Sequence, residues 1–142
     1  MDLPCVRTCK LSFTDETIDQ VLAMKTWAVV GLGNNPERAA FGVAKVLQDK
    51  GHKIVPVYPR AEEVHGEVGN KTLSEIPFPI DVVDCFVNSK LVGKVVDEAI
   101  AIGAKAVWLQ LDVIDEEAVA RAEAAGLLAI MDRCPAIEYK KR

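Results

Sequence analysis

The chain has 142 residues, of which 50% are hydrophobic and 27% are charged, and its Lys+Arg 17 and Asp+Glu 21 give a net charge of −4. This length suits a single domain over residues 1–142, and the composition excludes a disordered or low-complexity chain. The acidic balance argues against nucleic acid as a partner, and the apolar runs fall short of the roughly 18–20 residues of a membrane span.

The amino-terminal segment, residues 1–13, has no basic and then apolar signal sequence, so we expect a flexible segment on a cytoplasmic protein. The four cysteines, at positions 5, 9, 85 and 134, fit reduced thiols in that compartment better than a disulfide framework. Cys5 and Cys9 match half of a metal clamp, but the chain has no second close pair of ligands, so no metal is expected. Beyond this segment the sequence predicts a helix from Asp15 to about Met24, with Thr14 as its N-cap.

Five short apolar runs recur along the rest of the chain, and each is typical of a strand that is buried on both faces. Three of the helical patterns between them stop at a glycine directly before the next strand, at Gly51, Gly103 and Gly126. This order predicts an α/β domain, a Rossmann-like doubly wound parallel sheet of five or six strands flanked by helices. The expected strands are 27–30, 54–57, 82–87, 106–109 and 127–131.

The segment 61–78 has the least regular pattern of the chain. We expect it to hold a short edge strand near Gly66–Gly69 and a turn of helix. The edge strand would be the sixth strand of the sheet.

The candidate ligand site lies at the carboxyl ends of the strands, because open parallel sheets bind their ligands there. After the first strand, a glycine-rich loop allows a tight turn and close approach of a ligand, and the next helix points its N-terminal amides at this loop. Pro36 suits the first turn of that helix, and Arg38 in the same turn is placed to reach a phosphate oxygen. The candidate binding residues are Gly31, Leu32, Gly33, Asn34, Asn35, Arg38, Val57, Tyr58, Pro59, Arg60, Val87, Asn88, Ser89 and Gln110.

The loop is not a complete dinucleotide fingerprint, because Pro36 stands at the third glycine position. That fingerprint also needs an acidic residue about 20 residues further on, at the end of the second strand, whereas the stretch 51–60 has no Asp or Glu. Both differences disfavour NAD. Arg60 at the same place suits an additional phosphate on the adenosine ribose, which NADP and coenzyme A both carry.

A family resemblance starts at the same loop, which reads Gly31-Leu32-Gly33-Asn34-Asn35-Pro36-Glu37-Arg38. It resembles the G-A-S-x-x-P-x-R loop of the small bacterial and archaeal CoA-binding proteins, which are similar to the N-terminal domain of the succinyl-CoA synthetase alpha subunit. The resemblance extends from about Thr17 to Glu138 and is most specific in Trp-Leu-Gln at 108–110 and Asp-Arg-Cys-Pro at 132–135. It implies a CoA ligand, with the loop on the pyrophosphate and the residues 58–60 and 87–89 beside the adenosine.

The sequence departs from the family pattern in three places. Gly33 replaces a serine and so removes a hydroxyl, and Ala39-Ala40 replaces a Pro-Ser pair at the helix start. Asp112 stands where the family usually has glycine, and its carboxylate either repels an anionic ligand or serves a turn. Ser89 also has two interpretations, because a serine just before a helix, here expected from about Lys90, commonly acts as its N-cap.

The expected function is binding of a small nucleotide ligand, coenzyme A or an acyl-CoA, by a module that acts as carrier, sensor or partner of an acyl-CoA enzyme. A protein partner or a homo-oligomer is compatible with this function. No catalytic residues are expected, because the chain has no G-x-S-x-G nucleophile elbow. The alternative is a minimal NADP-dependent oxidoreductase, which Arg60 equally permits.

Overall fold

The computed structural model of the chain describes residues 13–142, so the predicted flexible segment lies almost wholly outside the described residues, as do Cys5 and Cys9. Five parallel strands form one sheet in the order β2-β1-β3-β4-β5. The predicted α/β Rossmann-like fold is thereby confirmed. The elements are α2 (Asp15–Leu22), β1 (Thr26–Val30), α3 (Ala39–Asp49), β2 (Lys53–Val57), η1 (Leu73–Glu75), β3 (Val82–Cys85), α4 (Val92–Ala101), β4 (Ala106–Leu109), α5 (Glu116–Ala124), β5 (Leu128–Ile130) and α6 (Pro135–Lys140).

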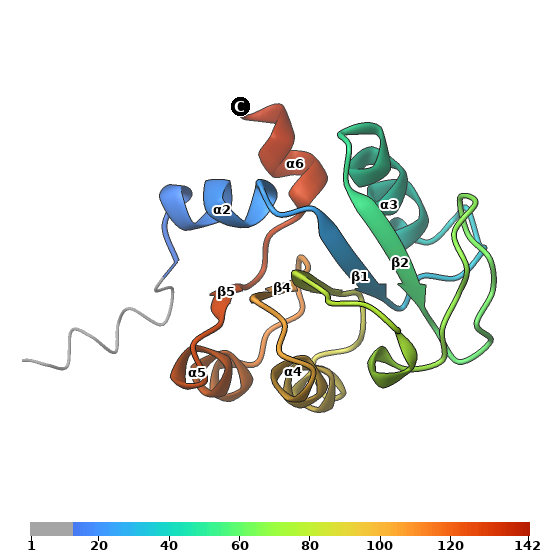
Figure 1. Cartoon of the computed structure of the whole chain (residues 1–142). Helices are drawn as coiled ribbons and strands as arrows, with labels where there is room; N and C mark the ends of the chain where they lie inside the picture. Colours follow the sequence, from blue (N-terminus) through green and yellow to red (C-terminus); the bar gives the residue numbers. More distant parts are fainter. Residues whose placement is uncertain (1–12) are drawn as a thin grey trace, which may run out of the picture.

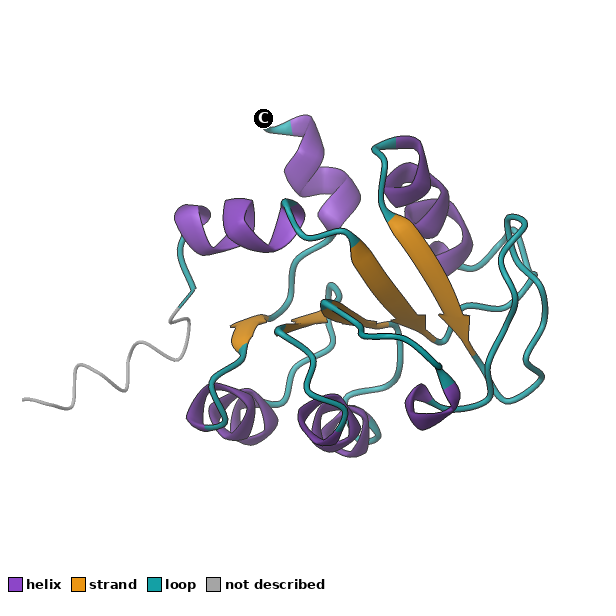
Figure 2. Ribbon diagram, in the orientation of Figure 1, coloured by secondary structure: helices purple, strands orange, loops and turns teal. Residues whose placement is uncertain are grey.

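Helices cover both faces of the sheet (Figure 1). On one face lie α2, α3 and α6, and on the other lie α4, α5 and the single turn η1, as Figure 2 shows with the helices in purple. Alternate strand residues therefore enter two cores, Trp27 and Trp108 on the α3 face and Val83 and Val107 on the α4 face. The predicted burial of Trp108 in the core is confirmed.

Local signals set the ends of several helices where the sequence predicts them. The Thr14 hydroxyl accepts a hydrogen bond from the Thr17 amide, 3.2 Å away, at the start of α2. Gly51, Gly103 and Gly126 follow the ends of α3, α4 and α5 with φ of 98°, 77° and 95°. Glycine adopts this left-handed conformation without the steric cost that a Cβ imposes, so each helix stops and the chain turns into the next strand.

The segment 61–78 differs in part from its prediction. The turn of helix is present as η1, but the edge strand near Gly66–Gly69 is not, because this region makes only two isolated bridges, Val57 with Asn70 and Val64 with Glu67. The sheet of the described residues therefore has five strands. The third strand also ends earlier than predicted, at Cys85, which leaves Phe86 and Val87 beyond the sheet.

Two neighbouring polar groups are buried in β3. The Asp84 side chain is fully buried, and neither carboxyl oxygen has a hydrogen-bond partner among the described residues. Burial raises the pKa of this carboxyl well above its usual range. Burial, and then the nearby Asp84, likewise raise the pKa of the Cys85 thiol, which fits the prediction that Cys85 acts as a small apolar core residue.

In residues 13–142 no helix is long and apolar enough to cross a membrane.

Candidate functional site

The strand order places a crevice at the carboxyl end of β1. Strand β1 lies between β2 and β3. The helix that follows β1 is α3, which covers one face of the sheet, and the helix that follows β3 is α4, which covers the other face. Such a switch point is where open α/β sheets bind ligands. The loop from Gly31 to Arg38 connects β1 to α3 at this point.

Gly31 begins this loop in a conformation that requires glycine. Its φ is 99°, and a Cβ at this position would lie 2.5 Å from the Phe86 carbonyl oxygen. Its amide donates to the Val57 carbonyl, 2.8 Å away, so the loop is tied to the end of β2. Leu32 is fully buried, which leaves only its backbone for a ligand.

An acidic residue that sequence analysis missed lies against the same loop. A Glu62 carboxylate oxygen accepts a hydrogen bond from the Asn34 amide at 2.8 Å, and it would lie 3.1 Å from a Cβ on Gly33. The Asn34 side chain donates in turn to the Glu63 carbonyl, 2.9 Å away. The Glu62 carboxylate thus accepts a hydrogen bond from a loop amide. In glycine-rich loops, phosphate oxygens accept hydrogen bonds from amides of the same kind.

The end of the loop differs from the prediction. Pro36 and Arg38 do not lie in the first helical turn, because α3 begins at Ala39 with Arg38 as its N-cap residue. The preceding residues form a separate turn in which the Asn35 side chain accepts from the Glu37 amide at 2.9 Å. The Asn35 side chain therefore holds the loop itself, and Arg38 is left exposed at its edge.

The end of β2 makes a tight turn through Pro59 and Arg60. The Ala61 amide donates to the Tyr58 carbonyl at 2.8 Å, and Ala61 has φ of 51°. The Tyr58 ring lies beside Gly33, whose added Cβ would be 3.2 Å from a ring carbon. This turn presents the exposed Arg60 guanidinium toward the glycine loop, since both line one hollow.

The residues after β3 only partly follow the prediction. The Asn88 side chain accepts from the Lys90 amide at 2.7 Å, and Leu91 is the N-cap residue of α4. Ser89 is therefore not the helix cap. Its hydroxyl accepts from the Ile114 amide at 2.9 Å, which ties this end to the loop after β4.

The loop after β4 is a turn built around Asp112. This residue has φ of 68°, and its amide donates to an Asp132 carboxylate oxygen at 2.7 Å. The cap of the following helix is Asp115, whose carboxylate accepts from the Ala118 amide at 3.0 Å. The geometry thus supports the turn role of Asp112. Gln110 precedes this turn and is 6% exposed.

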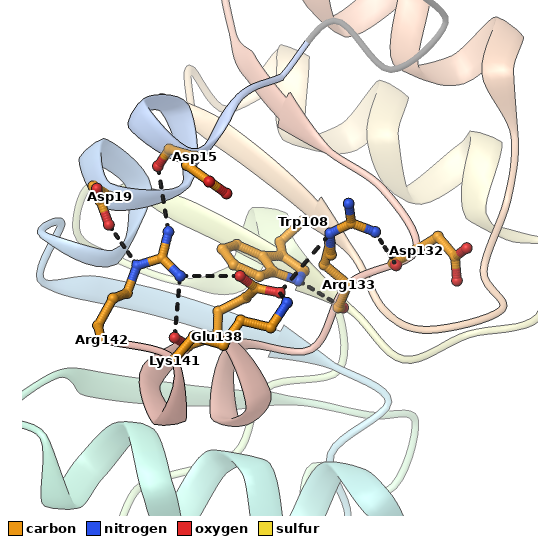
Figure 3. Close-up of polar contacts among 8 residues, drawn as sticks. All are labelled: Asp15, Asp19, Trp108, Asp132, Arg133, Glu138, Lys141 and Arg142. Atoms are coloured by element: carbon orange, nitrogen blue, oxygen red, sulfur yellow. Dashed lines mark hydrogen bonds and ion pairs between the residues drawn. The ribbon is translucent and has the colours of Figure 1, made fainter.

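The two most specific sequence runs contact each other in the fold. The Trp108 indole N–H donates to the Arg133 carbonyl at 2.9 Å, although the ring itself lies in the core. Arg133 forms an ion pair with Glu138, which is 2% exposed and also binds the Arg142 guanidinium at 3.0 Å (Figure 3). This network fixes the loop after β5 beside the end of β4.

Three hollows meet along this edge of the sheet, and Arg38 lines all of them. We name them the glycine-loop hollow, of about 480 Å³, the α4 hollow, of about 490 Å³, and the α3 hollow, of about 300 Å³. The first contains Gly31, Gly33, Asn34, Asn35, Arg38, Tyr58 and Arg60, the second adds Val57, Pro59, Val87 and Asn88, and the third contains Gln110. Leu32 and Ser89 line none of the three.

The glycine-loop hollow combines two cations and one anion. Within the described chain, no hydrogen bond or ion pair engages the Arg38 or Arg60 guanidinium, so both are available to a ligand. Glu62 opposes them in the same hollow. The two guanidinium groups attract an anionic group in this hollow, and the Glu62 carboxylate opposes it. Among residues 13–142, no group of three or more His, Cys, Asp or Glu side chains is arranged to hold a metal ion.

We expect Glu62→Gln to tighten the binding of a phosphate-bearing ligand about tenfold, measured with coenzyme A as the probe. Two like charges about 4 Å apart repel by roughly 4 kcal/mol at an effective dielectric of 20, and solvent around a half-buried side chain removes much of this. Gln retains an oxygen that can accept from the Asn34 amide, so the loop keeps its hydrogen bond. Titration calorimetry at low and high salt measures the gain, which should shrink as salt rises.

The matched control is Asp112→Asn, which removes the same charge from a residue outside the three hollows and retains a side chain that tolerates positive φ. It should change the affinity by less than about twofold, since its charge is exposed and screened. Equal gains in the two variants would show a general charge effect rather than a local one.

Comparison with known proteins places the chain in a family. The sequence model of the CoA binding domain family matches residues 25–140, which is most of the chain. The chain belongs to the CoA-binding domain family. The matched region includes β1 to α6 and all three hollows.

Relatives of this CoA-binding domain occur alone and within larger enzymes. The chain is 37% identical over 110 residues to the uncharacterized protein YneT of Bacillus subtilis, with 78% of this chain and 82% of YneT covered. It is 36% identical over 81 residues to the alpha subunit of an ADP-forming acetate–CoA ligase of Pyrococcus furiosus, covering 56% of this chain and 18% of that subunit.

Solved structures share the fold of the chain. A hypothetical protein from Pyrococcus horikoshii is 40% identical and superposes with a TM-score of 0.86, covering 91% of this chain and 92% of that protein. A Thermus thermophilus protein is 30% identical with a TM-score of 0.85, covering 91% of this chain and 98% of the other. An acetyl-coenzyme A synthetase from Ca. Korarchaeum cryptofilum shares the fold at 24% identity and a TM-score of 0.69, with 79% of this chain and 27% of the synthetase covered.

Proposed function

We propose that this chain binds coenzyme A or an acyl-CoA at the carboxyl edge of its sheet, as a non-catalytic carrier, sensor or partner of an acyl-CoA enzyme. The observation that carries the proposal is the glycine-loop hollow, which brings the Gly31–Arg38 loop and Arg60 together in a CoA-binding domain. The relationship to a ligase alpha subunit supports the role as partner of a larger enzyme.

The three hollows suggest how the ligand lies. Loop amides and Arg38 would bind the pyrophosphate, because charge-assisted hydrogen bonds favour phosphate oxygens at such a site. Arg60, at the end of β2, would bind the phosphate on the adenosine ribose. The adenosine itself would enter the α4 hollow, where Val57, Pro59 and Val87 provide apolar contacts.

We expect CoA to raise the melting temperature of the protein more than NAD does at equal concentration. A ligand present at about 100 times its dissociation constant stabilises the folded state by roughly 2.7 kcal/mol. Differential scanning fluorimetry with CoA, NAD and NADP makes the comparison in one buffer. Equal or greater stabilisation by NAD contradicts the proposal, and a dominant effect of NADP favours the oxidoreductase instead.

A further inference from the structure

The α3 hollow adjoins the proposed CoA site but has a different lining. Ala40 and Val43 of α3 form one wall, and Leu111 and Val113 from the loop after β4 form another. Val43 and Val113 are each 8% exposed, whereas Leu111 is 47% exposed, so the hollow has a nearly covered floor and one open side. The recess is thus mainly apolar.

One buried polar side chain in this lining lacks a partner. Gln110 is 6% exposed, and its side-chain carbonyl oxygen is buried without a hydrogen bond from any described residue. An unsatisfied buried acceptor of this kind is unfavourable unless a donor reaches it. The terminal torsion of glutamine is soft, so a small rotation would present this oxygen to an N–H group arriving in the hollow.

The α3 hollow shares lining residues with the two other hollows, which the proposed CoA site comprises. Arg38 lines both it and the glycine-loop hollow, while Phe86 and Val87 line both it and the α4 hollow. A ligand whose phosphates lie at Arg38 can therefore extend past Phe86 into the recess. The flexible arm of coenzyme A carries amide N–H groups and ends in the sulfur that bears an acyl group. An amide N–H of the arm suits the Gln110 oxygen, and the acyl group suits the apolar lining beyond it.

We propose, on the basis of the function proposed above, that the α3 hollow binds a short, neutral acyl group of an acyl-CoA thioester. An amide N–H of the arm donates to the Gln110 carbonyl oxygen, and the acyl carbons lie against Ala40, Val43 and Val113. Free CoA leaves this apolar recess unfilled. An acyl group that ends in a carboxylate would be buried there without a second cation, because Arg38 is engaged by the phosphates.

A series of ligands tests this inference on the unmodified protein. Titration calorimetry compares CoA with acetyl-, propionyl-, butyryl- and succinyl-CoA under the same conditions. Each added methylene should tighten binding about three- to fourfold until the recess is full, because burying one methylene contributes a nearly constant free energy. Succinyl-CoA should bind more weakly than butyryl-CoA.

A pair of variants on one helix locates the effect. Val43→Phe fills the recess and should abolish the gain from acetyl to butyryl while free CoA still binds. Val46→Phe makes the same change one turn along α3, at a residue outside the hollow, and should preserve the gain. Circular dichroism of both variants checks that each is folded.

The results separate this inference from the proposed function. If CoA and every thioester fail to bind, the proposed function is wrong, and the acyl site with it. If CoA binds and the affinity is flat along the series, or if the gain survives in Val43→Phe, only the acyl site is wrong. A rise along the series that Val43→Phe abolishes supports it.

Discussion

Replacing Arg60 by Ala should weaken the binding of coenzyme A by about 10- to 100-fold and leave the binding of 3′-dephospho-CoA nearly unchanged. A hydrogen bond to a charged group contributes about 1.5–3 kcal/mol, and the guanidinium has no competing partner among the described residues. Titration calorimetry measures the affinity of both ligands for the wild type and for the variant. The four values form a cycle that gives the interaction free energy between Arg60 and the ribose phosphate.

Two further variants make this result specific. Arg38→Ala should weaken both ligands to a similar extent, since its proposed partner is the pyrophosphate that both carry. Lys45→Ala removes a cation from the exposed side of α3, where it pairs with Asp49 at 3.0 Å, and should have little effect on either ligand. If Arg60→Ala weakens CoA and dephospho-CoA equally, Arg60 does not bind the ribose phosphate.

The second large effect concerns stability. At pH 8 we expect Asp84→Val to be more stable than the wild type by about 1–3 kcal/mol, because an unsatisfied buried polar group costs this much. Asp84 lies in register with Val29 of β1 and Trp108 of β4, in a fully buried position where an apolar β-branched side chain fits the sheet. Urea unfolding at several pH values measures the difference.

The pH dependence follows from the sign of the pKa shift. Burial raises the pKa of Asp84 in the folded state above its value of about 3.9 in an unfolded chain. The free energy of unfolding of the wild type is therefore highest, as far as Asp84 is concerned, below about pH 4. It falls as the pH rises from about 4 through the folded-state pKa, because the unfolded chain then releases the Asp84 proton more readily than the folded chain. The Asp84→Val variant lacks this decrease.

Asp84→Asn separates the charge from the polarity of the buried group. Asp84→Asn should also remove the decrease in stability with rising pH. At pH 4 it should be little more stable than the wild type, because its amide remains unpaired. A wild type that is more stable than Asp84→Val at pH 8 would show that the carboxyl has a favourable partner in solution.

The sequence by itself indicated the alternation of strands and helices, the glycine ends of three helices and, through the family resemblance, the CoA-binding domain family. Thr14 caps its helix through a residue only three positions away, and Gly51, Gly103 and Gly126 each end a helix through their own backbone conformation. Such signals depend on near neighbours, so they can be interpreted without the fold. The buried strands are equally local, because an uninterrupted apolar run of four or five residues needs two covered faces.

Only the tertiary structure decided how the loops of the site support one another. Glu62 contacts the amide of Asn34 across 28 positions, and the Ser89 hydroxyl turns toward Ile114 across 25. Neither residue has a local pattern that indicates these partners, so Glu62 was missed and Ser89 was interpreted as a helix cap or a ligand-binding residue. Their partners follow from the strand order β2-β1-β3-β4, which brings together loops that are distant in the sequence. Contacts of this kind depend on which strands are neighbours, and neighbouring strands are chosen by packing of the whole sheet rather than by any short segment.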